Sequence, residues 1–285
     1  MKTKRLFLLA IIALCSIHAS MGLDLQKRVK GNEQFASEER LAEPFNSLSA
    51  SGSIDIQVEY SPIQAPLRIE AESNIIPLIN TTVKKGVLNI EFEKKRSISP
   101  NAAVRVIVSV PEIQSVTLGG SGNLIFGSGF NQPTLKVTIN GSGSINFIDT
   151  KAEQLDIVVN GSGDLRGSIF AHKDIRMNLK GSGNITLSID ETKTIRANMK
   201  GSGGIKLTGK ASNTILRSSG SGMFDCQSLT TDHADIKMSG SGGGRLSVTK
   251  KISVNLSGSA GFTCHGKAKI GSYKIERSSS FSMQP

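Results

Sequence analysis

The stretch NGSGSINFIDTKAEQLDIVVNGSGDL, residues 140–165, contains the phrase Asn-Gly-Ser-Gly twice, at Asn140 and Asn160. Its Gly-Ser-Gly part recurs along the C-terminal half of the chain at steps of about 20 residues and decays to Gly258-Ser259-Ala260. A fixed period of this length is typical of a solenoid, in which each repeat is one coil that buries its apolar face against its neighbours. The complete phrases begin at Gly120, Gly141, Gly161, Gly181, Gly201, Gly220 and Gly240.

Apolar residues alternate with polar residues on both sides of each phrase. Leu155, Ile157 and Val159 precede one corner, and Ile145 and Phe147 follow the corner before it. A period of two residues marks a strand with one buried face. We therefore predict an all-β fold, a parallel β-helix-like solenoid whose coils of about 20 residues each contain two strands, a Gly-Ser-Gly corner and a second corner.

The corner glycines supply backbone angles that a Cβ would penalise, and they let neighbouring corners approach closely. We expect the corner serines to form a column of hydroxyls that bond to nearby backbone groups. The alternative is a nucleophilic serine or a phosphate-binding loop. Equivalent serines in every coil cannot all be one nucleophile, and neither a G-x-S-x-G elbow nor a phosphate loop ending in Lys-Ser or Lys-Thr is present. We interpret the phrase as structural.

The two ends of the chain differ from the repeat. Residues 1–19 have a basic start, a short apolar run and Ala19 at a suitable cleavage position, which predicts a secretory signal peptide. Cys15 follows Leu14, where a lipobox has a small residue, so we expect cleavage near Ala19 and no lipoprotein. Residues 20–43 are predicted to be a polar leader tail, partly helical or disordered, and residues 276–285 a flexible tail. Between them, we predict one solenoid domain over residues 44–275, with irregular coils at 44–118 and Gly-Ser-Gly repeats at 119–270.

Composition and charge restrict the partners. The formal net charge is +11, the positive excess lies in residues 120–285, and there is no Trp. No second long apolar stretch follows the signal peptide, so we predict no transmembrane segment in the mature chain. For an exported protein in the periplasm or at the cell surface, we expect anionic glycans, lipid headgroups or another envelope protein as partners rather than nucleic acid.

The order of segments resembles a known family. It runs AEPFNSLSASGSIDIQVEY, TTVKKGVLNIEF, VIVSVPEIQSVTLGGSGNLIF and then the Asn-Gly-Ser-Gly coils. This order is similar to the bacterial head GIN domain family of autotransporter adhesin-like proteins, frequent in Bacteroidetes, over about residues 44–270. The resemblance implies a right-handed parallel β-helix and export.

Metal binding is weakly supported. A calcium-binding β-roll needs a carboxylate in every repeat, because calcium takes six to eight oxygen ligands. His172, His233 and His265 lie at unrelated phases of the repeat and form no zinc spacing. We expect no metal and no cofactor. The residues that directly follow the corner phrase are Asn123, Ser144, Asp164, Asn184 and Gly204, so the carboxylate appears once.

A polysaccharide-active β-helix enzyme is the second alternative, by analogy of fold. Such an enzyme needs converging acids and bases, whereas Asp156 is flanked on neighbouring coils by Lys136 and Arg176, which predicts cross-strand charge pairing. We therefore predict that the protein is not an enzyme. The other acids of this region, which we place in solvated second corners, are Glu153, Asp174, Asp190 and Glu191.

Basic residues point outward in the strand before each corner. Stacked strands lie ~4.8 Å apart, so the register predicts that Arg176 faces Arg196 and Lys180 faces Lys200. Like charges directly opposite are unfavourable in a sheet, which suggests a patch for sulfated, carboxylated or phosphorylated polymers. A solvated charged face that protects the sheet is the alternative. The candidate binding residues are Arg176, Lys180, Arg196, Lys200, Arg217 and Lys237.

Two cysteines remain after the predicted cleavage, Cys226 and Cys264, each six residues after a corner glycine. This position puts both in one inward column, with Leu246 between them. They are then two coils or ~9.6 Å apart, beyond the ~7 Å between Cα atoms that a disulfide tolerates. We predict free, buried thiols.

These features predict an exported, non-catalytic binding or adhesin-like module of the cell envelope that contacts anionic glycans through a basic outer sheet face. The alternatives are the β-helix enzyme and an inert envelope scaffold.

Overall fold

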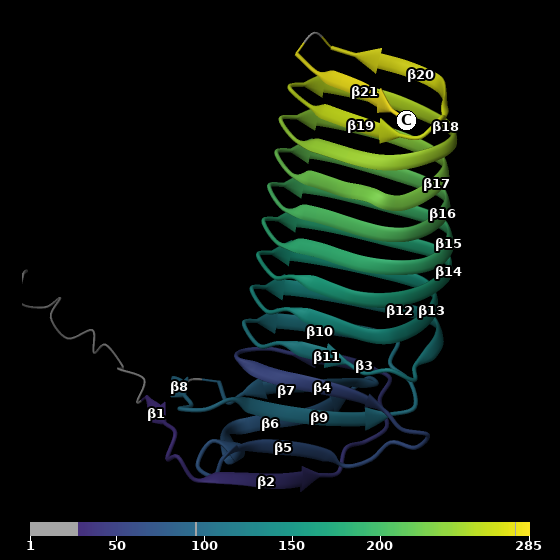
Figure 1. Cartoon of the computed structure of the whole chain (residues 1–285). Coiled ribbons are helices and arrows are strands. Elements are labelled where there is room, and N and C mark those ends of the chain that lie inside the picture. Colours follow the sequence, from purple (N-terminus) through teal and green to yellow (C-terminus); the bar gives the residue numbers. More distant parts are fainter. Residues whose placement is uncertain (1–27, 95, 277) are drawn as a thin grey trace, which may run out of the picture.

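The computed structural model describes residues 28–94, 96–276 and 278–285. Nearly all of its regular structure is strand, with a single short 3-10 turn, η1 (Ile76–Leu78), among the described residues. Figure 1 shows an elongated stack with β2 at one end and β20 and β21 at the other. The predicted signal peptide and Cys15 lie outside the described residues.

The strands form an N-terminal group and a solenoid group. The N-terminal group consists of β1 (Val29–Lys30), β2 (Phe35–Arg40), β3 (Ser47–Ala50), β4 (Ile54–Tyr60), β5 (Leu67–Glu72), β6 (Ile79–Lys84), β7 (Val87–Phe92), β8 (Ile98–Ser99) and β9 (Val104–Val110). The solenoid group consists of β10 (Ser115–Gly120), β11 (Leu124–Phe126), β12 (Asn131–Gly141), β13 (Ile145–Gly161), β14 (Leu165–Gly181), β15 (Asn184–Gly201), β16 (Gly204–Gly220), β17 (Met223–Gly240), β18 (Gly243–Gly258), β19 (Gly261–His265), β20 (Lys269–Ile275) and β21 (Ser280–Gln284).

The predicted solenoid is confirmed. Parallel pairing places the corner glycines in line from coil to coil, so that Gly161 faces Gly181 and Gly181 faces Gly201. The residues before each corner form one sheet, which we call face A, running from β6 and β7 through β3, β10 and β12 to β20. The residues after each corner form the opposite sheet, face B, running from β2 through β5, β9, β4 and β11 to β21.

The second corner is not an interruption of the strand. Each of the long strands β13 to β18 continues from face B through this corner into face A. The bend is made inside the strand by register shifts, for example between Phe147 and Thr150 and between Lys206 and Gly209. Local backbone supports the bend, because Asp149 has φ 46° and Gly209 has φ 115°. Gly-Ser-Gly is therefore the corner at which one strand ends and the next begins.

The two corner glycines are needed for different reasons. Gly181 has φ +129°, and a Cβ on it would lie 2.2 Å from the carbonyl oxygen of Gly161. Gly183 has no positive φ, but a Cβ there would lie 2.1 Å from the carbonyl oxygen of Gly163. The coils stack too closely here for any side chain.

The corner serines differ from our expectation. Ser182 is exposed, and its backbone N–H, rather than its hydroxyl, donates to Gly161 O at 3.0 Å. Gly183 N donates to the same carbonyl at 3.2 Å. No hydroxyl of these corner serines bonds to backbone in the described part of the chain. The Gly161 carbonyl already accepts hydrogen bonds from Ser182 N and Gly183 N, so it does not need the serine hydroxyl as a donor.

The core consists of the predicted inward columns. Leu155, Ile157 and Val159 are fully buried, as are Ile175 and Leu179 in the next coil. Cys226 and Cys264 belong to the column after the corner, where Leu246 faces both of them from the strand between. Both cysteines are buried and free.

Part of the predicted polar leader, residues 20–43, is structured. Strand β2 pairs antiparallel with β5, and β1 pairs with β8. Arg40 donates to Ile79 O and to Ile76 O, which closes the N-terminal end of the core with a charged side chain. These contacts are tertiary, so a sequence without apolar alternation still forms a strand.

Glu72 fastens the segment that precedes β2. Its side chain is buried and accepts hydrogen bonds from Glu33 N at 2.7 Å and from Asn101 N at 2.8 Å. Burial raises the pKa of this carboxyl, but its hydrogen bonds together lower the pKa further, and the net shift is downward.

Residues 44–118, predicted as irregular coils, contain both parallel and antiparallel pairs. Strands β3 and β4 pair in parallel with β7 and β9, whereas β5 and β6 pair antiparallel with β9 and β7. The predicted flexible tail, residues 276–285, contains β21, which pairs in parallel with β19. No helix among the described residues is long and apolar enough to cross a membrane.

Candidate functional site

The six predicted binding residues all point outward from face A. The register places Arg176 opposite Arg196, Lys180 opposite Lys200, and Arg217 opposite Lys237, as the repeat predicted. Their side chains differ in what they contact, and this difference separates the arginines from the lysines.

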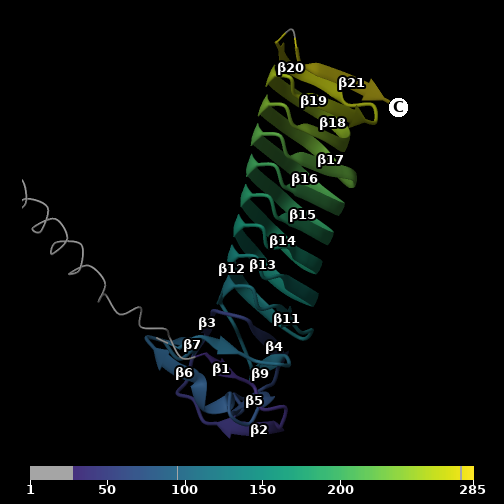
Figure 2. The same cartoon turned by 90° about the vertical axis from the view of Figure 1, so that its left-hand side faces the viewer.

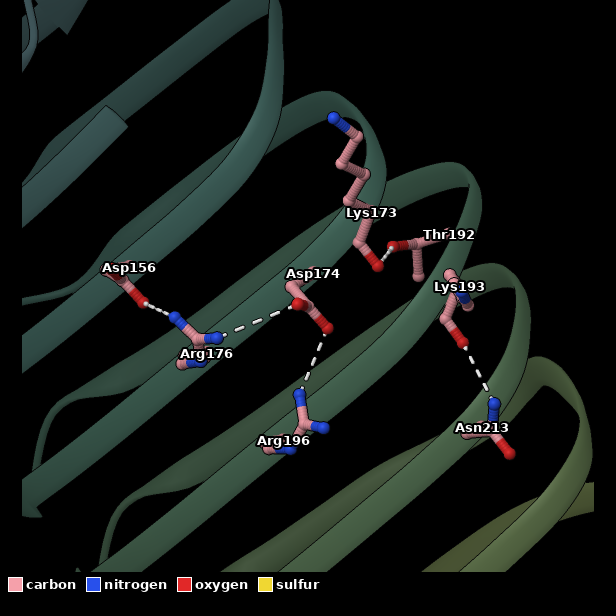
Figure 3. Close-up of polar contacts among 8 residues, drawn as sticks. All are labelled: Asp156, Lys173, Asp174, Arg176, Thr192, Lys193, Arg196 and Asn213. Atoms are coloured by element: carbon pink, nitrogen blue, oxygen red, sulfur yellow. Dashed lines mark hydrogen bonds and ion pairs between the residues drawn. The ribbon is translucent and has the colours of Figure 1, made fainter. Parts of the chain in front are cut away.

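The arginines are neutralised by aspartates (Figure 3). Asp174 lies between two of them, 3.6 Å from Arg176 and 3.0 Å from Arg196. Arg176 also lies 3.5 Å from Asp156. The like charges that the register places opposite each other are therefore bridged by a shared carboxylate. Arg217 forms a corresponding pair with Asp235, at 2.5 Å, and donates to the backbone carbonyl of that residue at 2.9 Å.

The lysines have no such partner. Lys180, Lys200 and Lys237 are exposed, and none has a carboxylate within 4.0 Å in the described part of the chain. The ammonium groups available to a ligand on this face are therefore those of lysines.

Face A is hollowed where small side chains replace long ones. In the column directly before the corner, Lys180 and Lys200 are followed by Ser219 and Ser239. A hollow of about 270 Å³ opens around these serines. Its lining residues are Asn198, Met199, Lys200, Arg217, Ser218, Ser219, Lys237 and Ser239.

A second hollow lies next to the first along the same strands. It has a volume of about 390 Å³. Both hollows are lined by strands β15, β16 and β17. On each of these strands, the residues that line the second hollow precede the residues that line the first. From Thr194 to Lys200 the pair spans six residues, or ~20 Å at the rise of a strand. We call the two hollows together the trough. The second is lined by Thr194, Arg196, Asn213, Thr214, Ile215, His233, Ala234, Asp235, Lys251 and Ser253.

Amide side chains extend the polar surface beside the trough. Asn198 donates to Asn178 Oδ1 at 3.1 Å, and Asn160 donates to Asn140 Oδ1 at 2.9 Å. These ladders run from coil to coil. Arg176 and Lys180, on β14, also lie beside the trough and do not line it.

Several acids of the solenoid form ion pairs or hydrogen bonds between coils. Asp164 accepts from Asn184 N in the next coil at 2.9 Å and pairs with Arg166 at 2.8 Å. Burial raises its pKa, but these partners lower it more. Asp225 pairs with Arg245 at 2.8 Å, and its pKa is lowered mainly by that hydrogen bond. Within the described ranges no group of three His, Cys, Asp or Glu side chains is placed to hold a metal ion.

A larger hollow, of about 450 Å³, lies across β2, β5 and β9. Its charged residues, Glu70 and Arg105, form a pair at 3.6 Å. It therefore has no excess of cations, unlike the trough.

Sequence reasoning missed several residues of this site. The sequence predicts Asp174 in a solvated corner, because the bend within the strand that brings it onto face A leaves no pattern in the sequence. Ser219 and Ser239 do leave a signal in the sequence, since the column that begins with asparagines and lysines continues with serines after Lys200. His233 and Lys251 occupy outward positions of the same strands.

The comparisons agree with this architecture. A family model described as "Putative auto-transporter adhesin, head GIN domain" matches residues 44–169 and 168–268. No curated protein matches the chain.

Solved structures from Parabacteroides are similar in fold. A "Putative lipid binding protein" from Parabacteroides distasonis is 22% identical, with 91% of this chain and 100% of that chain covered and a TM-score of 0.67. A "putative adhesin" from Parabacteroides merdae is 18% identical, with coverages of 90% and 99% and a TM-score of 0.71. Another from P. distasonis is 18% identical, with the same coverages and a TM-score of 0.68. With family-model matches over most of its length, the chain belongs to the head GIN domain family.

Proposed function

We propose that the protein is an exported, non-catalytic binding module of the cell envelope whose trough holds a chain of an anionic glycan. The observation that supports this proposal most strongly is the trough. It consists of two adjoining hollows along β15–β18, with the exposed lysines Lys200 and Lys237 at one end and Lys251 at the other.

The shape and chemistry of the trough support an extended polar ligand. Its length of ~20 Å accommodates several sugar units in line with the strands. Serine and asparagine side chains supply donors and acceptors for hydroxyl groups, and the lysines supply charge for carboxylate or sulfate groups. The paired arginines, Arg196 and Arg217, hold the lining in place while the lysines stay available.

The trough has too few free carboxylates for polysaccharide cleavage, which favours a binding role. Asp235, the acid that lines the trough, is held by Arg217. Hydrolysis of a glycosidic bond uses two carboxyl groups that face each other across the scissile bond. The trough contains one acid that is already paired, together with several cations.

The test is binding to immobilised heparin, a sulfated polymer, and to polygalacturonate, a carboxylated one, with dextran as the uncharged control. The double variant Lys200→Ser/Lys237→Ser should weaken binding about tenfold, since exposed charge pairs contribute ~0.5–1 kcal/mol each. A matched double variant, Lys136→Ser/Lys193→Ser, removes the same charge, from another part of face A and from a second corner.

Binding of the wild type that weakens as salt is added, and that only the trough variant loses, supports the proposal. An equal loss of binding in both double variants would show that binding depends on the net charge of the protein and not on the trough. No retention of the wild type on either polymer would favour the inert scaffold, and turnover of polygalacturonate would favour the enzyme.

A further inference from the structure

Of the ten exposed large apolar side chains among the described residues, three lie in the last coil and two lie in or beside β2. At the C-terminal end, Ile270, Tyr273 and Met283 are 49%, 58% and 37% exposed. At the N-terminal end, Phe35 and Leu41 are 70% and 91% exposed. Isolated exposed apolar residues are common, but a group at each end of a stacked sheet marks an interaction surface.

The C-terminal residues belong to the core columns. Ile270 faces Ile252 of the preceding coil, Tyr273 faces Val254, and Met283 faces Cys264. Their counterparts one coil earlier are buried, whereas no described strand covers β20 or β21. The last coil thus presents the open end of the core together with two strand edges.

The strand at the opposite end of face B has a matching edge. Among the strands of the described residues, β2 pairs with β5 alone. It is antiparallel to β5, which is antiparallel to β9, and β9 is parallel to the solenoid strands. By these pairings, strand β2 has the same sense as β21, which lies at the other end of the stack (Figure 1). Figure 2 shows the same two ends from the side. Their lengths also match, at six and five residues.

The charges of the two ends are opposite. The exposed residues around β2 include four glutamates, and the exposed residues of the last coil include three lysines. A contact between two C-terminal ends would bring lysines together, and a contact between two N-terminal ends would bring glutamates together, so both contacts are repulsive. Contact between unlike ends pairs opposite charges, so charge selects the polarity of association. The residues are Glu33, Glu38, Glu39 and Glu43 against Arg40 at one end, and Lys267, Lys269 and Lys274 against Glu276 at the other.

We propose that copies of this chain associate head to tail, with the β20–β21 end of one copy seated on the β2 end of the next. Strand β21 pairs in parallel with β2 of the following copy, which continues face B across the junction. The exposed apolar side chains of the last coil are covered by the β2 end of the next copy, where Leu41 is exposed. A head-to-tail contact with this polarity is heterologous, so it generates open filaments rather than closed dimers. A filament repeats the trough along its length and raises avidity for a long polymer.

Sedimentation velocity of the full chain, from micromolar to millimolar concentration, tests the proposal. The weight-average mass should rise continuously with concentration and fall with added salt. The variant Lys269→Glu/Lys274→Glu makes both ends acidic, and the variant Glu33→Lys/Glu39→Lys makes both ends basic. Each alone should lower the association constant by about tenfold or more.

Mixing the two variants is the decisive arm. In the mixture each acidic end meets a basic end, so association should return to at least the wild-type level. The control Lys193→Glu/Lys210→Glu, in the second corners, should associate like the wild type. A monomer at every concentration, association that stops at a dimer, or a mixture that stays monomeric would each overturn the proposal.

Discussion

The Asp174 carboxylate of β14 lies 3.0 Å from the Arg196 guanidinium of β15, which joins two neighbouring coils on the outer side of face A. The same carboxylate contacts Arg176, directly opposite Arg196 in the register. One acid thus allows two arginines to stack in a parallel sheet, and it leaves the lysines as the charges that a ligand can reach.

Replacing Asp174 should therefore destabilise the stack. We expect Asp174→Asn to lower the free energy of unfolding by ~0.5–1 kcal/mol, because Arg176 and Arg196 then repel each other. Urea denaturation at low and high salt measures the effect, and added salt should reduce the loss by screening the repulsion. The variant Asp190→Asn, at an exposed second corner, is the control. A loss that does not depend on salt would argue against charge pairing as the cause.

The corner glycines should be far less replaceable than the serine between them. We expect Gly181→Ala and Gly183→Ala each to destabilise by roughly 1–3 kcal/mol, since a Cβ at either position meets backbone of the preceding coil. Ser182→Ala should change stability by less than ~0.5 kcal/mol, because its hydroxyl makes no hydrogen bond to the preceding corner. Chemical denaturation compares the three. A fully stable Gly183→Ala variant would show that the coils are not stacked this closely.

Acid should release the segment before β2. The pKa of Glu72 is lower in the folded than in the unfolded protein, so its contribution to stability is complete above the unfolded value, about 4.3. That contribution is lost as the pH falls through the lower folded value. Glu72→Gln should therefore be less stable than the wild type at neutral pH, and the difference should shrink in acid. Hydrogen exchange at residues 31–33 reports the release, with Glu43→Gln as the control. A difference that is independent of pH would contradict the role of the carboxylate.

The cysteines should be unreactive in the folded protein. Burial raises the pKa of Cys226 to about 12, and burial also raises the pKa of Cys264. Leu246 separates them, so they cannot form a disulfide without a change of register. We expect two thiols to titrate only after denaturation. A native disulfide would show that the alignment of the last coils is wrong.

The repeat made most of the solenoid predictable. Each coil repeats the same local rule, so the inward columns and the cross-coil neighbours of Arg176 and Lys180 follow from counting residues. Strand β2 could not be predicted in the same way, because the residues that face the buried apolar positions of β5 are Ala36, Glu38 and Arg40, and five of its six residues are exposed. It is a strand because β5, Glu72 and the carbonyls beside η1 hold it there.

The tail and the trough show where a signal was present but not used. Phe281 and Met283 alternate in β21 and continue the columns of Phe262 and Cys264, which would have predicted one more strand. The trough depends on two serines that are shorter than their column neighbours, and on bends within the strands that bring Asp174 beside Arg196. The short serines are visible in the sequence once the columns are aligned. The position of Asp174 depends on the three-dimensional path of the second corner.

Backbone amide chemical shifts during titration with a heparin oligosaccharide test the central claim most directly. The amides of Asn198, Ser219 and Ser239 line the trough and should move in a saturable way, while those of the Gly181 corner stay unchanged. Added salt should reverse the shifts. Saturable shifts confined to face B or to the β2 end, or the same trough shifts in the Lys200→Ser/Lys237→Ser variant, would contradict the account.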